Sequence, residues 1–321
     1  MEESQFNDAL QTREDYEKSE EILDAIKTDL NDIFKGYCTL ETHLKNIPDL
    51  LEIDGKDQYC NSPEIQNSAD SVRLQIQKDG RDNDPHGLLY DLRLRSSPIC
   101  IEYFFTDYAT ITTLRRNNDL PKIISASAVV HCDPLREIVL HIRNKHSSTY
   151  PECLHTLGGA FKPKIKDKNF ALYDKNIAMT AIREIMEESG LAIQWQPNMP
   201  LWWLHEERTG FRQMFVAGAP VTKANIEIME PSWEGHLIRL SFDDLADAIL
   251  LRGAFRHEGP SSQPLKWTPT GLLSVLLWVA NITPDRDIKF NGSSPSQFFF
   301  EMIKELKIQG IENLLGTEKR E

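Results

Sequence analysis

Apolar residues recur every three or four positions near the start of the chain, the spacing of an amphipathic helix. The stretch 12–34 carries this pattern, and Gly36 ends it. A second helix is predicted at 40–51. The acids of these helices are expected to form their solvent-exposed faces or, alternatively, a surface that binds a partner.

The middle of the chain changes to strand patterns, with β-branched and aromatic residues in short runs. Before this change, residues 54–97 are rich in Asp, Asn, Gln, Ser and Gly, which predicts an irregular connection with one or two short elements. A domain boundary is therefore placed near residue 95. Strands are predicted at 99–105, 109–114, 125–131 and 137–143.

The last third of the chain predicts a strand pair and two helices. The strands lie within 202–219 and turn at 208–210. One helix is predicted at 270–280 and a terminal helix at 297–306. The apolar side of the terminal helix would cover the N-terminal helices or a second copy of the chain.

Between these regions, residues 177–189 predict a helix with apolar residues on one side and acids on the other. At 100° per residue, Glu184, Glu187 and Glu188 share an arc of roughly 100°. Gly190 follows, and glycine accepts the left-handed conformation that commonly ends a helix. The helix is expected to pack on a sheet and to present a ridge of three carboxylates.

Three carboxylates on one arc repel one another, by about 4 kcal/mol per pair at contact distance near a protein surface. A solvated acidic face is one explanation of such a ridge. A divalent cation is the other, because Mg²⁺ prefers oxygen ligands and keeps waters and substrate phosphates in its remaining positions. The order of the surrounding residues favours the cation.

That order resembles the box of the Nudix hydrolase superfamily, which reads G-x5-E-x7-R-E-U-x-E-E-x-G-U with U aliphatic. The second half of the box is matched at every fixed position. The matching residues are Arg183, Glu184, Ile185, Glu187, Glu188, Gly190 and Leu191.

The first half of the box departs from this pattern. Gly158 and Gly159 are the candidates for its glycine, but the box would place that glycine at position 169, so about ten residues from 162–173 would be inserted. The first acid of the box falls on Lys175, and the nearest acid, Asp174, is expected to cap the helix. In the family this acid orients the loop and the Arg, so the departure affects loop geometry more than metal binding.

The resemblance implies an α+β fold, a Nudix-like α/β/α sandwich with a mixed sheet, preceded by a small helical N-terminal region. The helix at 270–280 would be the second helix of the sandwich. The expected domains are a helical and irregular region at 1–95, a Nudix-like domain at 96–285 and a C-terminal helical extension at 286–321.

The resemblance also implies roles for individual residues. Glu187 and Glu188 would bind Mg²⁺ or Mn²⁺, with Glu184 as a further ligand or general base. Arg183 would orient the acids, and Gly159 or the glycine before it would offer a backbone carbonyl to the metal.

A further acid, in a loop ahead of a later strand, completes the metal shell or activates water in many members of the family. Glu234 is the candidate here and Glu230 the reserve. Arg143, Lys145 and His146, and the basic segment 161–168, would meet a substrate phosphate or, alternatively, form solvated loops.

The net charge of −13 argues against an extended nucleic-acid partner, which needs a positive surface. Five cysteines without a C-x-x-C motif, together with an acidic N-terminus that lacks an apolar leader, predict a cytoplasmic protein. No membrane contact is expected, because the apolar stretch 272–282 is too short to span a bilayer. The expected partner is a small phosphorylated nucleotide-type substrate, with a homodimer or a protein partner through the N-terminal helices left open.

Two functions remain in view. The first is metal-dependent hydrolysis of a diphosphate linkage in a nucleoside diphosphate linked to another moiety, such as ADP-ribose or a nucleotide sugar. The alternative is a catalytically weak or inactive module that binds a nucleotide or a protein. The inserted loop and Lys175 motivate this alternative.

Overall fold

The computed structural model describes most of the chain between residues 21 and 317. Predictions that fall on other residues, including the first turns of the N-terminal helix and most of the basic segment, lie outside the described residues. The described ranges are 21–44, 51–59, 62–79, 83–93, 99–147, 149–163, 173–193, 201–231, 234–256, 264–282 and 287–317.

Within these ranges a nine-stranded mixed sheet forms the centre of the molecule. Its main path runs through β1 (Cys38–Leu44), β9 (Leu201–Glu206), β10 (Arg212–Pro220), β5 (Ile124–Cys132), β6 (Glu137–Arg143), β7 (Cys153–His155) and β12 (Lys266–Trp267). Off this path, β11 (Gly235–Ser241) pairs with β6, and β8 (Leu157–Ala160) pairs with β5. The β10–β5 and β12–β7 pairs are parallel, and the other pairs are antiparallel.

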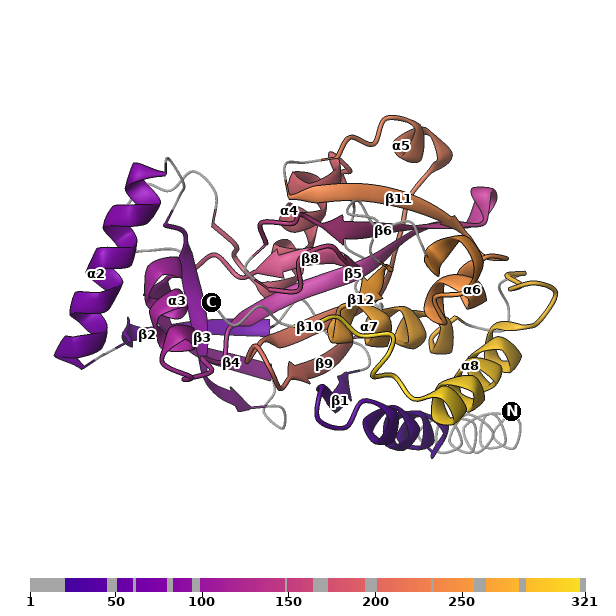
Figure 1. The fold of residues 1–321 in the computed structure, drawn as a ribbon, viewed down its shortest axis with the longest axis horizontal. Helices are drawn as coiled ribbons and strands as arrows, with labels where there is room; N and C mark the ends of the chain where they lie inside the picture. Colours follow the sequence, from indigo (N-terminus) through magenta and orange to yellow (C-terminus); the bar gives the residue numbers. More distant parts are fainter. Residues whose placement is uncertain are drawn as a thin grey trace, which may run out of the picture.

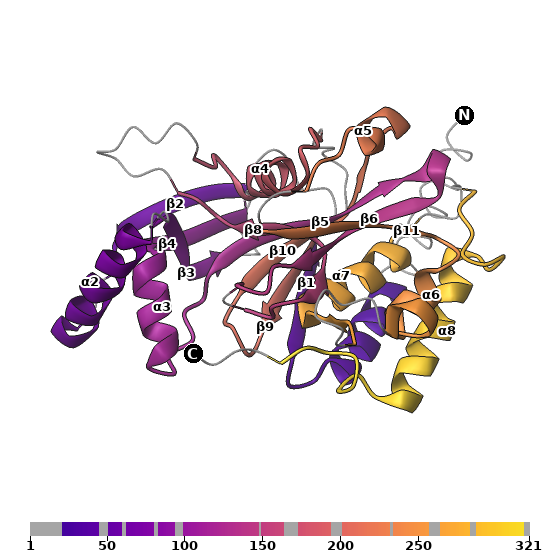
Figure 2. The same ribbon diagram turned by 45° about the horizontal axis from the view of Figure 1, so that its top comes forward.

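Helices cover both faces of this sheet (Figures 1 and 2). One face carries α4 (Ile177–Ser189), which is buried in one hydrophobic cluster with β5, β9 and β10, and the short α5 (Lys223–Glu227). The other face carries α6 (Leu245–Ile249), α7 (Pro269–Ala280), α8 (Pro295–Gln309) and the helix at 21–33, in a second cluster. Successive strand residues alternate between the two clusters: Trp202 belongs to one and Trp203 to the other.

The predicted α+β class with a mixed sheet is confirmed. The predicted hairpin corresponds to β9 and β10, and the two late helices correspond to α7 and α8. The terminal helix covers the N-terminal helix, as one of the two alternatives proposed: Phe298 and Phe299 share a core with Leu30, and Lys307 pairs with Asp29. No helix within the described ranges is long and apolar enough to cross a bilayer.

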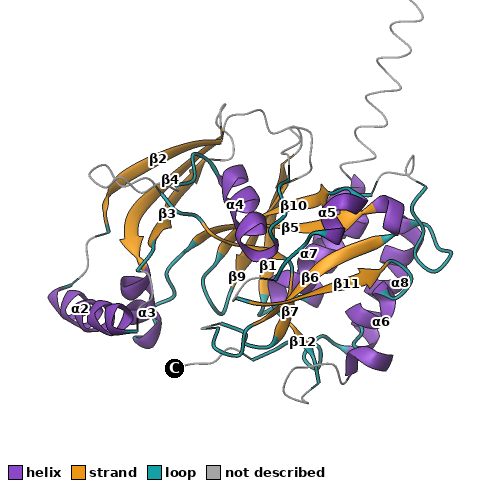
Figure 3. Ribbon diagram, turned by 90° about the horizontal axis from the view of Figure 1, so that it is seen from above, coloured by secondary structure: helices purple, strands orange, loops and turns teal. Residues whose placement is uncertain are grey.

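A second, three-stranded sheet lies beside the first (Figure 3). Its order is β2 (Leu51–Gln58), β4 (Ile99–Asp107) and β3 (Pro85–Arg93), with α2 (Pro63–Lys78) and α3 (Tyr108–Arg116) next to each other at one end. It joins the main sheet where Leu89 N–H donates to the Lys122 carbonyl at 2.8 Å. Because β3 and β4 pair across residue 95, the two sides of the predicted domain boundary share this sheet; the boundaries themselves stay a prediction.

Three predictions about this part of the chain are wrong. The stretch 54–97 was predicted to be irregular with one or two short elements, but it contains the end of β2, the whole of α2 and the whole of β3. The stretch predicted as a strand at 109–114 is helix α3, because Asp107 caps its start by accepting from Thr110 N–H at 2.9 Å and its apolar side is buried. The predicted helix at 40–51 begins instead as β1, whose Leu40 is held by both atoms of the Asn31 amide.

Candidate active site

The helix that carries the acidic ridge begins and ends at identifiable residues. Asn176 caps α4 by accepting a hydrogen bond from Met179 N–H at 2.9 Å, so the expected cap at Asp174 is wrong. Gly190 ends the helix in the left-handed conformation, as predicted, with φ of 70°. The apolar side of α4 faces β5 and β8, which fixes the acids against the end of β8.

Arg183 is the centre of the hydrogen-bond network around these acids. Its guanidinium donates to Asp174 at 2.8 and 2.9 Å and to the Ala160 carbonyl at 2.8 Å. It also donates to Glu184 at 2.7 Å and to Glu187 at 2.9 Å. Burial opposes the charge of Arg183, but these acids outweigh it and raise the pKa of Arg183 above its usual value. One rigid fork therefore orients three carboxylates and the end of β8.

Asp174 is a buried acid that holds the side chain of Arg183. It is 4% exposed and accepts from Arg183, from Lys162 N–H at 2.9 Å and from the Thr180 hydroxyl at 3.0 Å. It thereby ties the end of β8 to the start of α4. The sequence pointed to this acid only as the nearest one to Lys175, because the intervening residues shift it by one position.

Glu184 and Glu188 lie directly against the diglycine. Gly158 N–H donates to Glu188 at 2.8 Å. A Cβ at Gly159 would overlap the Glu184 carboxylate, and a Cβ at Gly158 would overlap the backbone of β5. Glycine is needed here for close backbone approach, so the predicted proximity of these acids and the diglycine is present in the structure.

Both acids are buried, and burial disfavours their charged forms. Glu184 is 6% exposed and Glu188 is 2% exposed. Burial raises the pKa of Glu184 to about 8, with Arg183 opposing the shift and Glu188 adding to it. Burial also raises the pKa of Glu188 to about 8, with the charge of Glu234 adding to it.

The remaining predicted acids occupy different positions. Glu187 is more exposed and is shared between Arg183 and Lys162, whose Nζ lies 3.7 Å from it. Glu234 precedes β11, and its backbone carbonyl accepts from Asn144 N–H at 2.7 Å, close enough for its charge to act on Glu184 and Glu188. Glu230 lies instead at the C-terminal end of α4, where its N–H donates to the Ser189 carbonyl.

The donor set fits a hard divalent cation: two buried carboxylates beside peptide carbonyls, with a third carboxylate on the same helix. Across the described ranges, no three His, Cys, Asp or Glu side chains are already gathered as a metal centre. Glu184 and Glu187 each accept a hydrogen bond from the Arg183 guanidinium, so a cation would compete with Arg183 for these oxygens. The metal ligands stay a proposal.

Sequence reasoning missed His141, on β6. It is 2% exposed, and its Nδ1 lies 3.4 Å from Glu188 Oε1. Burial and, to a smaller extent, the charge of Arg143 lower the pKa of His141 to about 4, with the charge of Glu234 opposing the shift. The strand pattern predicted only that His141 lies in a strand; the pairing of β6 with β11 and β7, and the contact with Glu188 of α4, determine its neighbours.

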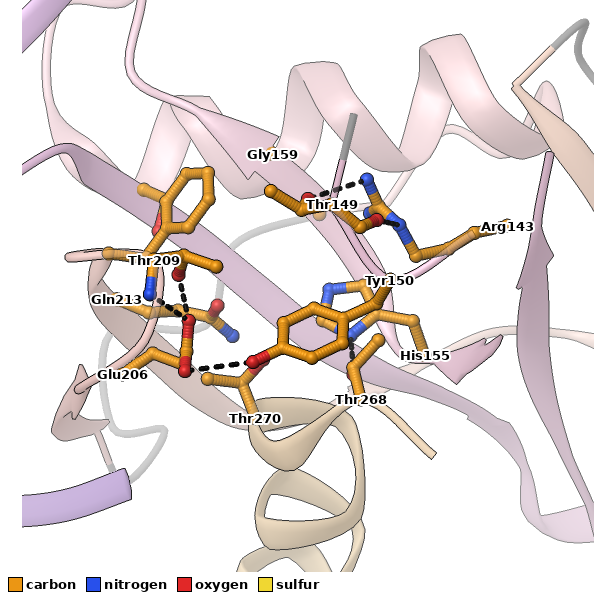
Figure 4. A pocket seen from close by; sticks show the side chains of 13 residues that line it. Arg143, Thr149, Tyr150, His155, Gly159, Glu206, Thr209, Gln213, Thr268 and Thr270 are labelled. Carbon is orange, nitrogen blue, oxygen red and sulfur yellow. Dashed lines mark hydrogen bonds between the residues drawn. The ribbon is translucent and has the colours of Figure 1, made fainter. Parts of the chain in front are cut away.

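A polar cavity opens beside the diglycine (Figure 4). Tyr150 donates to buried Glu206 at 3.0 Å, and His155 is hydrogen-bonded to Thr268 at 2.7 Å. Arg143 is held by the Thr149 carbonyl at 2.9 Å, and of the three basic residues predicted to meet phosphate it alone lines this cavity. The lining residues are Ser125, Arg143, Thr149, Tyr150, His155, Gly158, Gly159, Glu206, Thr209, Phe211, Gln213, Thr268 and Thr270.

Known structures with a similar chain trace include a MutT protein and two NUDIX hydrolases. A MutT protein from Methanosarcina mazei Go1 is 16% identical, with a TM-score of 0.27 over 43% of this chain and 85% of that one. A NUDIX hydrolase from Nitrosomonas europaea is 13% identical, with a TM-score of 0.32 over 53% of this chain and 98% of that one. A MutT NUDIX hydrolase from Burkholderia pseudomallei is 18% identical, with a TM-score of 0.28 over 47% of this chain and 96% of that one.

This chain resembles the Nudix hydrolases. No family model matches the sequence, and no curated protein matches it.

Proposed function

We propose that this chain is a metal-dependent hydrolase that cleaves a diphosphate linkage in a nucleoside diphosphate linked to another moiety. One observation carries the proposal: Glu184 and Glu188 are buried against the diglycine, beside an arginine that cannot neutralise them both. Arg183 does not hydrogen-bond Glu188, and burial favours the protonated form of both acids; a bound divalent cation would displace these protons and hold both carboxylates charged.

Mg²⁺ or Mn²⁺ would be held by Glu184 and Glu188, with Glu187 and the Gly159 carbonyl as further ligands. When bound, the metal neutralises the diphosphate and lowers the pKa of an attacking water. Glu234 is the proposed acid that completes the site or activates that water. Its charge already acts on Glu188, which supports this position.

The protein residues around the metal would position the substrate. Arg183 holds the acids in place through its five hydrogen bonds. Arg143 lines the cavity beside the diglycine and would bind a phosphate or a leaving group that carries negative charge. The hydroxyl and amide groups of the cavity would hydrogen-bond a ribose or sugar, as in other sites that combine a few polar groups with a concave surface. Displacement at phosphorus depends mainly on such positioning and charge stabilisation.

The test is hydrolysis of a panel of ADP-ribose, nucleotide sugars and dinucleoside polyphosphates with Mg²⁺ or Mn²⁺. In ¹⁸O-labelled water, one phosphate product should carry the label. Glu188→Gln should lower kcat/KM at least about a hundredfold, since it removes a charged ligand from the site. Glu227→Gln, an exposed acid on α5 paired with Lys223, is the control and should be unchanged.

If the chain binds these compounds but hydrolyses none of them with either metal, the proposal is wrong. The alternative, a nucleotide-binding module without turnover, then takes its place. The role of Asp174 weakens the main reason for that alternative, because the displaced acid still orients Arg183.

A further inference from the structure

His141 is a buried imidazole without a hydrogen bond. Neither of its ring nitrogens has a hydrogen-bond partner among the described residues. Its cross-strand neighbour on β7, His155, provides a contrast, since its Nδ1 is bonded to the Thr268 hydroxyl at 2.7 Å. Buried polar atoms in folded proteins nearly always have a partner, so the two orphan nitrogens of His141 need an explanation.

The surroundings of His141 point to a cation. Its Nδ1 lies 3.4 Å from Glu188 Oε1, and the charge of Glu234 acts on the ring from the β11 side. Gly235 leaves room for the ring, because a Cβ at this position would overlap His141 Nε2. The unpartnered nitrogen therefore faces the carboxylate that the proposed function assigns to the metal.

The separation of the two atoms suits a shared ligand position. Two ligands that bind one cation at about 2.1 Å each, in adjacent positions, lie about 3 to 3.5 Å apart. The Nδ1–Oε1 distance falls in this range, although the geometry does not make a hydrogen bond. A neutral imidazole offers one lone pair to a metal and is a common ligand of transition-metal ions.

We infer that His141 is a nitrogen ligand, through Nδ1, for the cation held by Glu188, and that the site consequently prefers a transition-metal divalent cation such as Mn²⁺ over Mg²⁺. The inference rests on the proposed function, because it adds a ligand to the same metal site. Mg²⁺ takes oxygen ligands and gains little from an imidazole, whereas affinity for nitrogen donors rises along the first-row divalent metals.

The test uses Mn²⁺ as the probe, with the full-length protein and no substrate. Electron spin-echo envelope modulation of the Mn²⁺ complex should show ¹⁴N coupling in the wild type. The coupling should disappear in His141→Leu and persist in the matched control His155→Asn, which keeps a hydrogen-bonding atom for Thr268. Isothermal titration should show Mn²⁺ affinity weakened at least about tenfold in His141→Leu, the smaller end of losses seen when groups around metal sites are removed. Mg²⁺ affinity should change little.

A second readout separates ligation from a structural role. Since His141 makes no hydrogen bond, His141→Leu should leave the melting temperature of the metal-free protein unchanged or raised. If this variant does not fold, His141→Gln replaces it in the same spectra. Wild type that binds Mn²⁺ without ¹⁴N coupling overturns the inference alone, and wild type that binds neither Mn²⁺ nor Mg²⁺ overturns the inference together with the proposed metal-dependent function.

Discussion

Two arginine–aspartate pairs, one beside each sheet, share the same two-hydrogen-bond contact but differ in the number of acids around them. In the small sheet, Arg73 of α2 donates to Asp107 at 2.7 and 3.3 Å, and Asp107 also caps α3. In the main sheet, Arg183 donates to Asp174 at 2.8 and 2.9 Å. Both contacts are bidentate. The Arg73–Asp107 pair holds the start of α3, and the Arg183–Asp174 pair holds the loop before α4.

The difference lies in the number of acids that each arginine serves. Arg73 pairs with Asp107 and with exposed Asp70. Burial opposes the charge of Asp107, but the hydrogen bonds that Asp107 accepts outweigh this effect and lower the pKa of Asp107 to about 2. Arg183 serves Asp174 and also Glu184 and Glu187, while Glu188 lies buried beyond its reach. The first cluster pairs one partly buried acid with its arginine, whereas the second holds a buried carboxyl that its arginine does not reach, and a proton or a bound cation must neutralise that group.

The largest expected effect is that of breaking the Arg183 network. Arg183→Leu should destabilise the protein by about 3–5 kcal/mol, because it leaves Asp174 and Glu184 buried without their partner. Chemical denaturation at pH 7 measures this loss. Adding Asp174→Asn should recover part of the stability, but hydrolysis should stay lost because the remaining acids are no longer oriented.

Arg73→Leu is the matched variant in the small sheet. Arg73 and Asp107 are each about one quarter exposed, so the loss should be smaller, about 1–2 kcal/mol. Hydrolysis per folded molecule should be unchanged. Equal destabilisation by the two leucine variants would contradict the difference drawn between the clusters.

Replacing Glu188, unlike replacing Arg183 or Arg73, is expected to stabilise the metal-free protein. The pKa of Glu188, about 8 when folded, is above the roughly 4.3 of an unfolded glutamate. The folded state therefore binds the proton more tightly, and this contribution to stability is lost as pH rises from about 4 through about 8. Glu188→Gln should remove that loss and stabilise the metal-free protein at pH 8.5, by about 1–3 kcal/mol.

Thermal unfolding with a chelator between pH 4 and pH 8.5 tests this sign. The gain of Glu188→Gln should shrink toward pH 4 and should turn into a relative loss when Mn²⁺ is added, because only the wild type is stabilised by a bound ligand. A variant that is destabilised at pH 8.5 without metal would show that Glu188 is a structural acid.

How far the sequence predicted this site depends on whether its contacts are local. The order Arg183-Glu184 and Glu187-Glu188 lies on one helix, so periodicity and the following glycine predicted both the helix and the ridge. The contact of Asp174 with Arg183 and the place of His141 in the site were not predicted, because both arise between segments: Asp174 reaches Arg183 across the loop, and His141 reaches Glu188 from a strand. No local pattern encodes such a distance.

The type of two elements was predicted wrongly because the local conformational preference of their residues differs from the structure that tertiary contacts impose. Helix α3 reads as a strand because Ile and Thr favour extended structure, yet its buried side faces α2 and the small sheet, and Asp107 starts it. Strand β1 was predicted as the start of a helix because its local sequence does not show that it pairs with a distant strand. Its backbone is extended by pairing with β9, a strand more than 150 residues away in the sequence.

The smallest expected effect is that of replacing Asp107, the partner of Arg73 beside the small sheet. The pKa of Asp107, about 2 when folded, is below the roughly 3.9 of an unfolded aspartate, so its contribution is fully present above about pH 4 and is lost as pH falls through 2. Asp107→Asn should therefore cost about 1–2 kcal/mol at pH 7 and progressively less below pH 4. Urea unfolding from pH 7 to pH 2.5 measures this slope, which runs opposite to that of Glu188→Gln. If both variants showed the same slope, the buried carboxyl at the diglycine would no longer distinguish the two clusters, and the reason for placing a cation there would be lost.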